Sequence, residues 1–417
     1  MPVRTEARSK RGPAALWLGY AAVLVVAPWI FSSSLALTLL TQMGIAIVAC
    51  LAFNMLLGQG GMLSFGHAVY SGLGGYVAMH ALNRISAGSS DLPVSLVPLV
   101  GGAAGLFFAA LFGSLATRKS GTVFAMITLG LGELVWASSL MFPGFFGGEG
   151  GISGNRVAGP VRWGIGFGPP TELYYLTAAY TFVCTALMYA FTRTPLGRLL
   201  NAVRDNSERV AFIGYDARLV RYLAFVTSGL FMGIAGGLAA LNFEIVTSEV
   251  LSAQRSGAYL LFTFVGGTLV FFGPIIGAVL MVLALVLLSE VTQAWLLYLG
   301  LAFVVMVMVA PGGVASLVVT ALRTARDGRY KGRVATGLAV GASAFVALAG
   351  AAALIEMVYH LQLDATLGRP MRFLGLTLDT NAIGTWLGAA LVLFTGLGLF
   401  TLSRRQFLQS APPRQPS

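Results

Sequence analysis

Residues 35–57 read LALTLLTQMGIAIVACLAFNMLL, a stretch without a single charged side chain. A transmembrane helix needs about 20 predominantly apolar residues, and this stretch supplies them. It lies within a longer charge-free interval that runs from Arg11 to Arg84. Further charge-free intervals separate Asp91 from Arg118, Arg255 from Glu290, and Glu290 from Arg323.

The composition of the whole chain agrees with these intervals. Of its 417 residues, 57% are apolar and only 10% are charged, and the mean hydropathy is +0.83. Soluble domains carry about 25% charged residues, so this chain lacks the charge needed to cover a water-facing surface. The composition excludes a soluble enzyme and a disordered chain. We therefore expect an all-α fold, a polytopic transmembrane helical bundle.

The net charge of +11 does not indicate a nucleic-acid partner, because the basic residues cluster beside apolar runs. This distribution follows the positive-inside rule and predicts a protein in contact with the lipid bilayer. The basic N-terminus before an apolar run resembles a signal peptide, but a second run follows at once from Leu35, which predicts a retained first span. Cys50 and Cys184 both lie inside apolar runs, so a disulfide scaffold is not expected.

The basic clusters also predict a topology. If all five clusters are cytoplasmic, an even number of crossings separates each neighbouring pair, and both termini are cytoplasmic. The clusters are 1–11, 118–119, 193–221, 323–333 and 404–414. The twelve expected spans are 14–31, 35–57, 62–82, 92–117, 122–142, 173–192, 222–243, 256–272, 274–289, 291–310, 334–355 and 381–403. The glycine pairs within 256–289 predict a broken or re-entrant helix there.

These spans give an expected organisation of about ten core spans plus two extra C-terminal spans. The expected parts are a cytoplasmic N-terminus (1–13), a transmembrane core (14–317) with a cytoplasmic loop (193–221), a basic linker (318–333), a two-span extension (334–403) and a cytoplasmic tail (404–417). The core contains stripes of small residues four apart, such as Gly229, Gly233 and Gly237. Such stripes let helices approach closely, and we interpret them as helix packing.

The sequence lacks the motifs of common catalysts. No Gly-Lys dipeptide occurs, so there is no phosphate-binding P-loop. The three histidines are scattered, and no hydrolase motif is present. We therefore expect no enzymatic activity, no metal site and no cofactor in this chain.

One candidate site is the segment from Asn54 to His67, NMLLGQGGMLSFGH. Its glycines weaken a helix, and irregular backbone at membrane depth is tolerated only where it lines a cavity or is buried in protein. One interpretation is a segment that lines a translocation pathway; the other is a cytoplasmic turn with a helix-capping Ser64. The candidate pathway residues are Asn54, Gln59, Gly60, Gly61, Ser64 and His67.

A second candidate is Glu133, which lies 12 residues after Gly121. At 1.5 Å per residue this is about 18 Å, near the middle of the bilayer. Carboxylates inside membranes are costly and often functional, so Glu133 is also a candidate pathway residue. A structural Glu that is bonded to a neighbouring helix is the alternative.

Two loops complete the candidates. The segment from Pro143 to Gly154 is glycine-rich and is either a gate or docking loop or a flexible connector. The loop from Thr192 to Arg218 alternates charged residues with apolar anchors at helical spacing. This spacing stops at Gly214, which predicts a short amphipathic cytoplasmic helix that ends there. Its mixed charge favours a protein partner over lipid headgroups. The candidate partner-binding residues are Arg204, Asp205, Glu208, Arg209, Gly214 and Tyr215.

Several of these motifs together resemble a known family. They are GQGGMLSFGHAVYSGLGGYVAM, GTVFAMITLGLGEL, a glycine-rich loop ending GGISG, TPLGRLLNAVRDNSERVAFIGYD and FGPIIGAVL. Their types and order over residues 35–315 are similar to the permease subunits of branched-chain amino acid ABC importers, in particular the longer of two paired permeases. The resemblance ends near Pro311, and residues 323–417 have no counterpart in it.

The resemblance implies a bacterial inner-membrane importer with a second permease subunit, two cytoplasmic ATPases and a periplasmic substrate-binding protein. It implies that Asp205–Asp216 contacts an ATPase and that a small molecule, a branched-chain amino acid or a related solute, crosses the membrane. The residues alone leave a second function class open, a proton-coupled secondary carrier in which Glu133 or His67 binds the proton.

Overall fold

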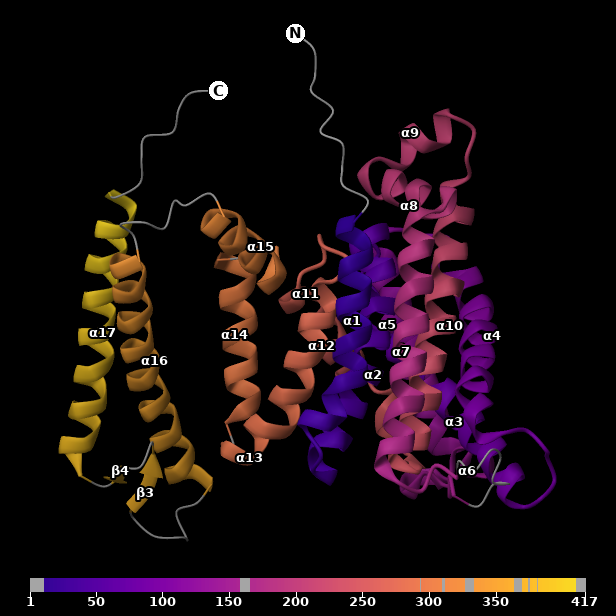
Figure 1. Ribbon diagram of the computed structural model, residues 1–417, viewed down its shortest axis with the longest axis horizontal. Coiled ribbons are helices and arrows are strands. Elements are labelled where there is room, and N and C mark those ends of the chain that lie inside the picture. The colour runs from indigo at the N-terminus through magenta and orange to yellow at the C-terminus, as the bar shows by residue number, and fades with distance from the viewer. Residues whose placement is uncertain are drawn as a thin grey trace. The chain divides into compact units, whose positions relative to one another are not determined.

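The computed structural model describes residues 11–157, 166–292, 294–309, 312–326, 334–363, 370–373, 376–380 and 382–409. The chain divides into two compact units (Figure 1). The first comprises residues 1–283 and 306–316, and the second comprises residues 284–305 and 317–417. The parts expected at 1–10, 327–333 and 410–417 lie outside the described residues.

The first unit consists of helices with two very short strands. Its elements are α1 (Arg11–Ile30), α2 (Ser34–Asn54), the π-helix η1 (Met55–Gln59), α3 (Ala68–Ser86), η2 (Val94–Leu96), α4 (Val97–Ala116), α5 (Gly121–Met141), α6 (Pro143–Phe146), η3 (Gly148–Gly150), β1 (Ile152–Ser153), α7 (Pro170–Arg193), α8 (Pro195–Asp205), α9 (Ser207–Phe212), α10 (Ala217–Phe243), β2 (Ile245–Val246), η4 (Ser248–Leu251), α11 (Ala253–Gly266) and α12 (Gly273–Leu283).

The second unit contains the C-terminal helices and a β-hairpin. Its elements are the π-helix η5 (Ala284–Leu288), α13 (Ser289–Val291), α14 (Trp295–Val309), α15 (Gly313–Arg326), α16 (Val334–Leu363), β3 (Pro370–Phe373), β4 (Leu376–Asp379) and α17 (Ile383–Gln409); the end of α14 and the start of α15 belong to the first unit. Where a linker was expected from residue 318, α15 continues as a helix to Arg326.

Each of the twelve expected spans overlaps a helix. The expected span 62–82 begins too early, because α3 starts at Ala68, and 256–272 ends too late, because α11 stops at Gly266. Among the described residues, seven helices are long and apolar enough to cross a membrane, or eight if the bent pair α14–α15 is one span. The polytopic helical bundle is therefore confirmed. Helix α11 has only 14 residues, about 21 Å at 1.5 Å per residue, which is shorter than the bilayer core. Twelve full crossings remain a prediction.

Close glycine packing joins α3, α4 and α10. A Cβ atom on Gly233 would lie 2.2 Å from the carbonyl oxygen of Gly101, and one on Gly105 would lie 2.3 Å from that of Gly229. On the α3 side, a Cβ on Gly236 would lie 1.8 Å from the carbonyl oxygen of Ser71. No side chain fits at these contacts, so the predicted role of the small-residue stripes in helix packing is confirmed.

The predicted break within 256–289 is present. Helix α11 ends at Gly266, and α12 begins at Gly273 after a turn in which Gly267 has φ +110°. A Cβ on Gly266 would lie 2.4 Å from the carbonyl oxygen of Gly273, so the two short helices meet at glycine. A left-handed φ at Gly267 carries no steric cost because the residue has no Cβ.

One end of the first unit is tied together by polar contacts. Strand β1 pairs antiparallel with β2. The backbone N–H of Arg156 donates to Oε1 of Glu244 (2.9 Å), and its guanidinium lies 3.8 Å from the other carboxylate oxygen. Helix α6 lies at this end, whereas α8 and α9 lie at the opposite end of the same unit (Figure 1).

In the second unit, α16 and α17 form an antiparallel pair. A Cβ on Gly396 would lie 2.4 Å from the backbone N of Ala347, and the Ser343 and Ser403 hydroxyls are hydrogen-bonded (3.0 Å). The phenol of Tyr298 on α14 donates a hydrogen bond to Glu356 on α16 (2.9 Å).

Candidate functional site

The segment that follows α2 contains several of the predicted pathway residues. Asn54 ends α2, the π-helix η1 covers Met55–Gln59, and no regular helix follows until Ala68. The break begins at Gly61, whose φ of +62° favours glycine. π-helical turns are rare and occur frequently at functional sites. The irregular segment from Gly60 to His67 therefore separates α2 from α3 within the bundle.

Helix α8 lies against this segment. The amide of Asn201 donates to the side-chain oxygen of Gln59 (2.9 Å), and the guanidinium of Arg204 donates to the carbonyl oxygen of Gly58. A Cβ on Gly61 would lie 2.8 Å from Cγ of Arg204. The structure thus brings a predicted partner-binding residue, Arg204, into direct contact with the predicted pathway segment.

The far end of the segment carries His67, whose side chain is fully buried. Its Nε2 lies 2.8 Å from the hydroxyl of Ser228 on α10, which itself donates to the carbonyl oxygen of Ala52 (2.6 Å). Because the serine hydrogen is used there, Nε2 of His67 is the donor in the first bond. Aromatic rings surround the imidazole edge-on: Phe53, Tyr70 and Phe225.

The position of His67 along the axis of the bundle follows from its hydrogen bond to Ser228. Ser228 lies 11 residues after the start of α10 and 15 residues before its end, about 17 and 23 Å along the helix axis. The first residue of α3 is therefore near the middle of the bundle, where its N–H donates to the hydroxyl of Ser256 in the first turn of α11 (3.0 Å). Two helices, α3 and α11, thus begin at mid-depth, an arrangement that transporters use around their pathways.

The backbone between η1 and His67 is closely packed against α5. Phe65 N–H donates to the hydroxyl of Thr128 on α5 (3.2 Å), and a Cβ on Gly66 would lie 2.0 Å from the carbonyl oxygen of Thr128. The hydroxyl of Ser64 and the amide oxygen of Asn54 are buried without a hydrogen-bond partner among the described residues. Buried polar groups without partners are uncommon, and two of them lie in this segment.

Glu133 lies apart from these residues. Helix α5 buries one stripe, which includes Thr128 and Gly132, and Glu133 is on the exposed opposite face. Among the described residues it has no hydrogen bond or ion pair. The structure therefore does not place it with His67.

The remaining predicted partner-binding residues lie on the arm formed by α8 and α9. The sequence predicts one helix here, but Asn206 has an extended backbone and its side chain caps α9 by accepting from Arg209 N–H (2.9 Å). Asp205 pairs with Arg204 (3.1 Å), and Glu208 and Arg209 are exposed. The arm ends in exposed apolar side chains, Phe212 (90%), Ile213 (64%) and Tyr215 (51%), around Gly214, which has φ +90°.

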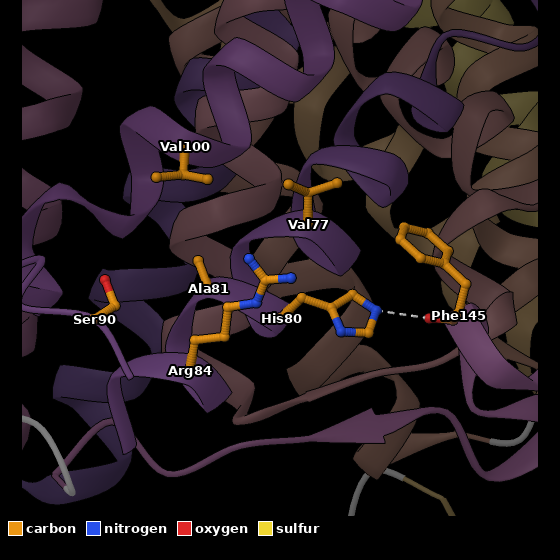
Figure 2. Close-up of a pocket in the computed structure, with 7 residues that line it drawn as sticks. All are labelled: Val77, His80, Ala81, Arg84, Ser90, Val100 and Phe145. Carbon is orange, nitrogen blue, oxygen red and sulfur yellow. Dashed lines mark hydrogen bonds between the residues drawn. The ribbon is translucent and has the colours of Figure 1, made fainter. Parts of the chain in front are cut away.

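A cavity of about 470 Å³ lies at the end of the unit opposite to the arm. Figure 2 shows the imidazole of His80 beside the side chain of Arg84, with Nε2 of His80 donating to the carbonyl oxygen of Phe145 (2.8 Å). This contact ties α3 to α6, the helical turn within the glycine-rich loop. The residues that line the cavity are Val77, His80, Ala81, Arg84, Ser90, Val100 and Phe145.

Sequence reasoning missed the residues that join these segments. Asn201, Ser228, Thr128 and Ser256 each bond to the segment 58–68 from a distant helix. Ser228 lies beside the small-residue stripe that begins at Gly229, so from sequence alone it is interpreted as a helix-packing residue. The polar character of Asn201 on the α8 side that faces the bundle is the one signal that could have indicated a contact.

Comparison with known proteins gives a consistent result. The family model described as "Branched-chain amino acid transport system / permease component" matches residues 35–310. The chain is 27% identical over 339 residues to the high-affinity branched-chain amino acid transport system permease protein LivM of Salmonella typhimurium, covering 75% of this chain and 78% of that protein. The protein of the same name from Escherichia coli is 27% identical over 312 residues, 70% of this chain and 72% of its own. No solved structure matches significantly.

Proposed function

The chain belongs to the family of branched-chain amino acid transport permeases, and from this premise we propose that it forms the membrane pathway of an ABC importer. The cargo is a branched-chain amino acid or a related small solute, as the names of the two relatives suggest. The chain is a multi-pass membrane protein and a transporter component. ATP hydrolysis is assigned to separate ATPase subunits.

One observation carries the proposal: the α8–α9 arm is attached directly to the irregular segment of the membrane core. Arg204 and Asn201 hold the backbone and side chains of η1, while the tip of the arm exposes Phe212 and Ile213. Exposed contiguous apolar residues mark protein interaction sites. A partner that moves the tip would displace the segment that leads to His67.

The roles of the remaining site residues follow from this arrangement. Asn54, Gln59, Gly60, Gly61 and Ser64 form the part of the pathway that the arm displaces, in which glycine permits the break, and His67 fixes its far end. The side chains of Asn54 and Ser64 are buried in this structure and meet a solute when the segment is displaced. Asp205, Glu208, Arg209, Gly214 and Tyr215 belong to the surface that meets the ATPase. Glu133 is on the exposed face of α5, so it belongs to the pathway only where a second subunit meets that face.

The arm also sets the proposed orientation. Because ATPases are cytoplasmic, the end with α8 and α9 faces the cytoplasm of a bacterium. The basic clusters near both termini favour the same side for them by the positive-inside rule. The opposite end, with α6 and the cavity beside Arg84, then faces the periplasm and the substrate-binding protein. The second permease subunit completes the pathway.

The secondary-carrier alternative is not favoured. The imidazole of His67 is enclosed by aromatic rings and bonded to a neutral hydroxyl, which suits a fixed structural contact better than a site that gains and loses a proton. Glu133 is on another face of the unit, so the two groups do not form a relay within this chain.

The test is to replace both Phe212 and Ile213 with serine in the assembled importer. We expect the variant to fold but to lose the co-purifying ATPase and ATP-driven uptake, because the apolar contact is removed. The matched control is Leu35→Ser, which removes an exposed apolar side chain (60%) at the opposite end of the unit. Full ATPase recovery and full uptake in the double variant would contradict the proposal.

A further inference from the structure

Helix α5 presents an exposed surface that its own unit leaves uncovered. The residues recur at intervals of three and four, so they share one side of the helix. We name this surface the α5 face; it comprises Met126, Leu129, Gly130, Glu133, Ala137 and Leu140.

The carboxylate of Glu133 is at the centre of the α5 face. It lies 12 residues after the first residue of α5 and 8 residues before the last, about 18 and 12 Å along the axis. The helix has the length and hydropathy of a membrane span. Ionisable residues within spans almost always face the interior of a bundle or a water-filled cavity and pair with another group. Lipid is therefore a poor neighbour for this face.

No described group of the first unit meets that need. Glu133 has no hydrogen bond or ion pair with any described residue. We therefore take the partner of its carboxylate from outside the described part of the first unit.

The shape of the face fits a second helix. Gly130 and Ala137 lie one turn before and one turn after Glu133, and a Cβ on Gly130 would meet nothing within 4 Å. Small residues at such positions let two helix backbones approach closely, and polar side chains between them form interhelical hydrogen bonds. Met126 and Leu140 provide apolar contact area above and below the polar centre.

The charge argues against a second copy of this chain as the occupant. In a symmetric dimer the same patch contacts itself, so two Glu133 carboxylates would approach each other in an environment of low dielectric constant. A different subunit with a hydrogen-bond donor at this level avoids that repulsion.

We propose that the α5 face packs against a helix of the second permease subunit, which donates a hydrogen bond to Glu133 and so encloses the carboxylate at the seam between the two subunits. The proposal rests on the proposed function, which supplies the second permease.

Photo-crosslinking in the complete importer tests this assignment. A benzoylphenylalanine residue replaces Met126 or Leu140 in separate variants, and the matched controls carry it at Leu111 on α4 or Val183 on α7, which are also exposed. We expect Met126 and Leu140 to give an adduct with the second permease and the controls to give none. Adducts only with lipid, with a second copy, or with residues 317–417 of the same chain would overturn the proposal.

A pair of substitutions tests the role of the carboxylate itself. Glu133→Gln keeps a side chain that accepts a hydrogen bond, so we expect the second permease to co-purify at nearly the native ratio. Glu133→Leu suits a lipid-facing position but removes the bond, and we expect subunit association about three- to tenfold weaker. Native association of Glu133→Leu would overturn the proposal.

These outcomes separate the two claims. If a second permease co-purifies but crosslinks only through Leu111 or Val183, the proposed function stands and the α5 face is wrong. If no second permease co-purifies with the wild-type chain, the proposed function itself fails.

Discussion

Replacement of Arg204 by alanine tests the connection between the arm and the membrane core. The guanidinium donates to the carbonyl oxygen of Gly58 and also pairs with Asp205. A hydrogen bond to a charged group contributes about 1.5–3 kcal/mol. Because the side chain is 36% exposed and the pair with Asp205 is on the surface, we use the lower value. About 1.5 kcal/mol corresponds to a roughly tenfold easier local opening of η1.

Amide hydrogen exchange of the purified chain measures this opening directly. The N–H groups of Gly61 and Met62 bond to the carbonyl oxygens of Leu57 and Leu56, so their exchange reports on η1. We expect exchange about tenfold faster at these amides in Arg204→Ala, and unchanged exchange in α4. The matched control is Arg198→Ala on the exposed side of the same helix, whose guanidinium has no partner among the described residues.

If Arg204→Ala abolishes uptake but leaves exchange at Gly61 and Met62 unchanged, Arg204 acts on the ATPase and not on η1. If Arg198→Ala accelerates exchange equally, the effect comes from loss of charge on α8 and not from the contact with Gly58.

Three further predictions concern packing, the second unit and topology. Gly233→Ala should lower the free energy of unfolding by about 1–3 kcal/mol through overpacking against Gly101. Gly19→Ala is the control, because a Cβ there would meet nothing within 4 Å. Thermal melts compare the two variants, and equal melting temperatures would contradict the close packing at Gly233. Tyr298→Phe should lower the free energy of unfolding by about 1 kcal/mol, because Glu356 loses a hydrogen-bond donor. Denaturant unfolding measures this change, and an unchanged midpoint would show that the bond does not contribute to stability. Ser89→Cys and Asn206→Cys should react with a membrane-impermeant thiol reagent from opposite sides of the membrane; labelling of both from one side would reverse the proposed orientation.

The helices could be predicted from the sequence because the bilayer imposes a strong constraint. Charge-free runs predict where helices lie, and every expected span has one. The depth at which a helix begins could not be predicted in the same way. Helices α3 and α11 start inside the bundle because Ser228, Ser256 and Thr128 satisfy the backbone and side chains there, and these partners come from distant helices.

In the candidate site, too, some features could be predicted from the sequence and others could not. The glycines and polar residues from Asn54 to His67 are recognisable as unusual within an apolar chain. Their attachment to the arm depends on Arg204 and Asn201, more than a hundred residues later. The break of the arm at Asn206 could not be predicted from helical spacing, because a capping side chain ends one helix while the periodicity continues into the next. The exposed position of Glu133 is a tertiary feature that periodicity alone does not predict.

Uptake of a radiolabelled branched-chain amino acid into proteoliposomes that contain the complete importer tests whether this chain is an ATP-driven permease. The binding protein is supplied outside, ATP is enclosed with the ATPases, and a protonophore collapses any proton gradient. We predict that uptake requires ATP and persists with the protonophore. Uptake by this chain alone, without ATP and abolished by the protonophore, would contradict the account.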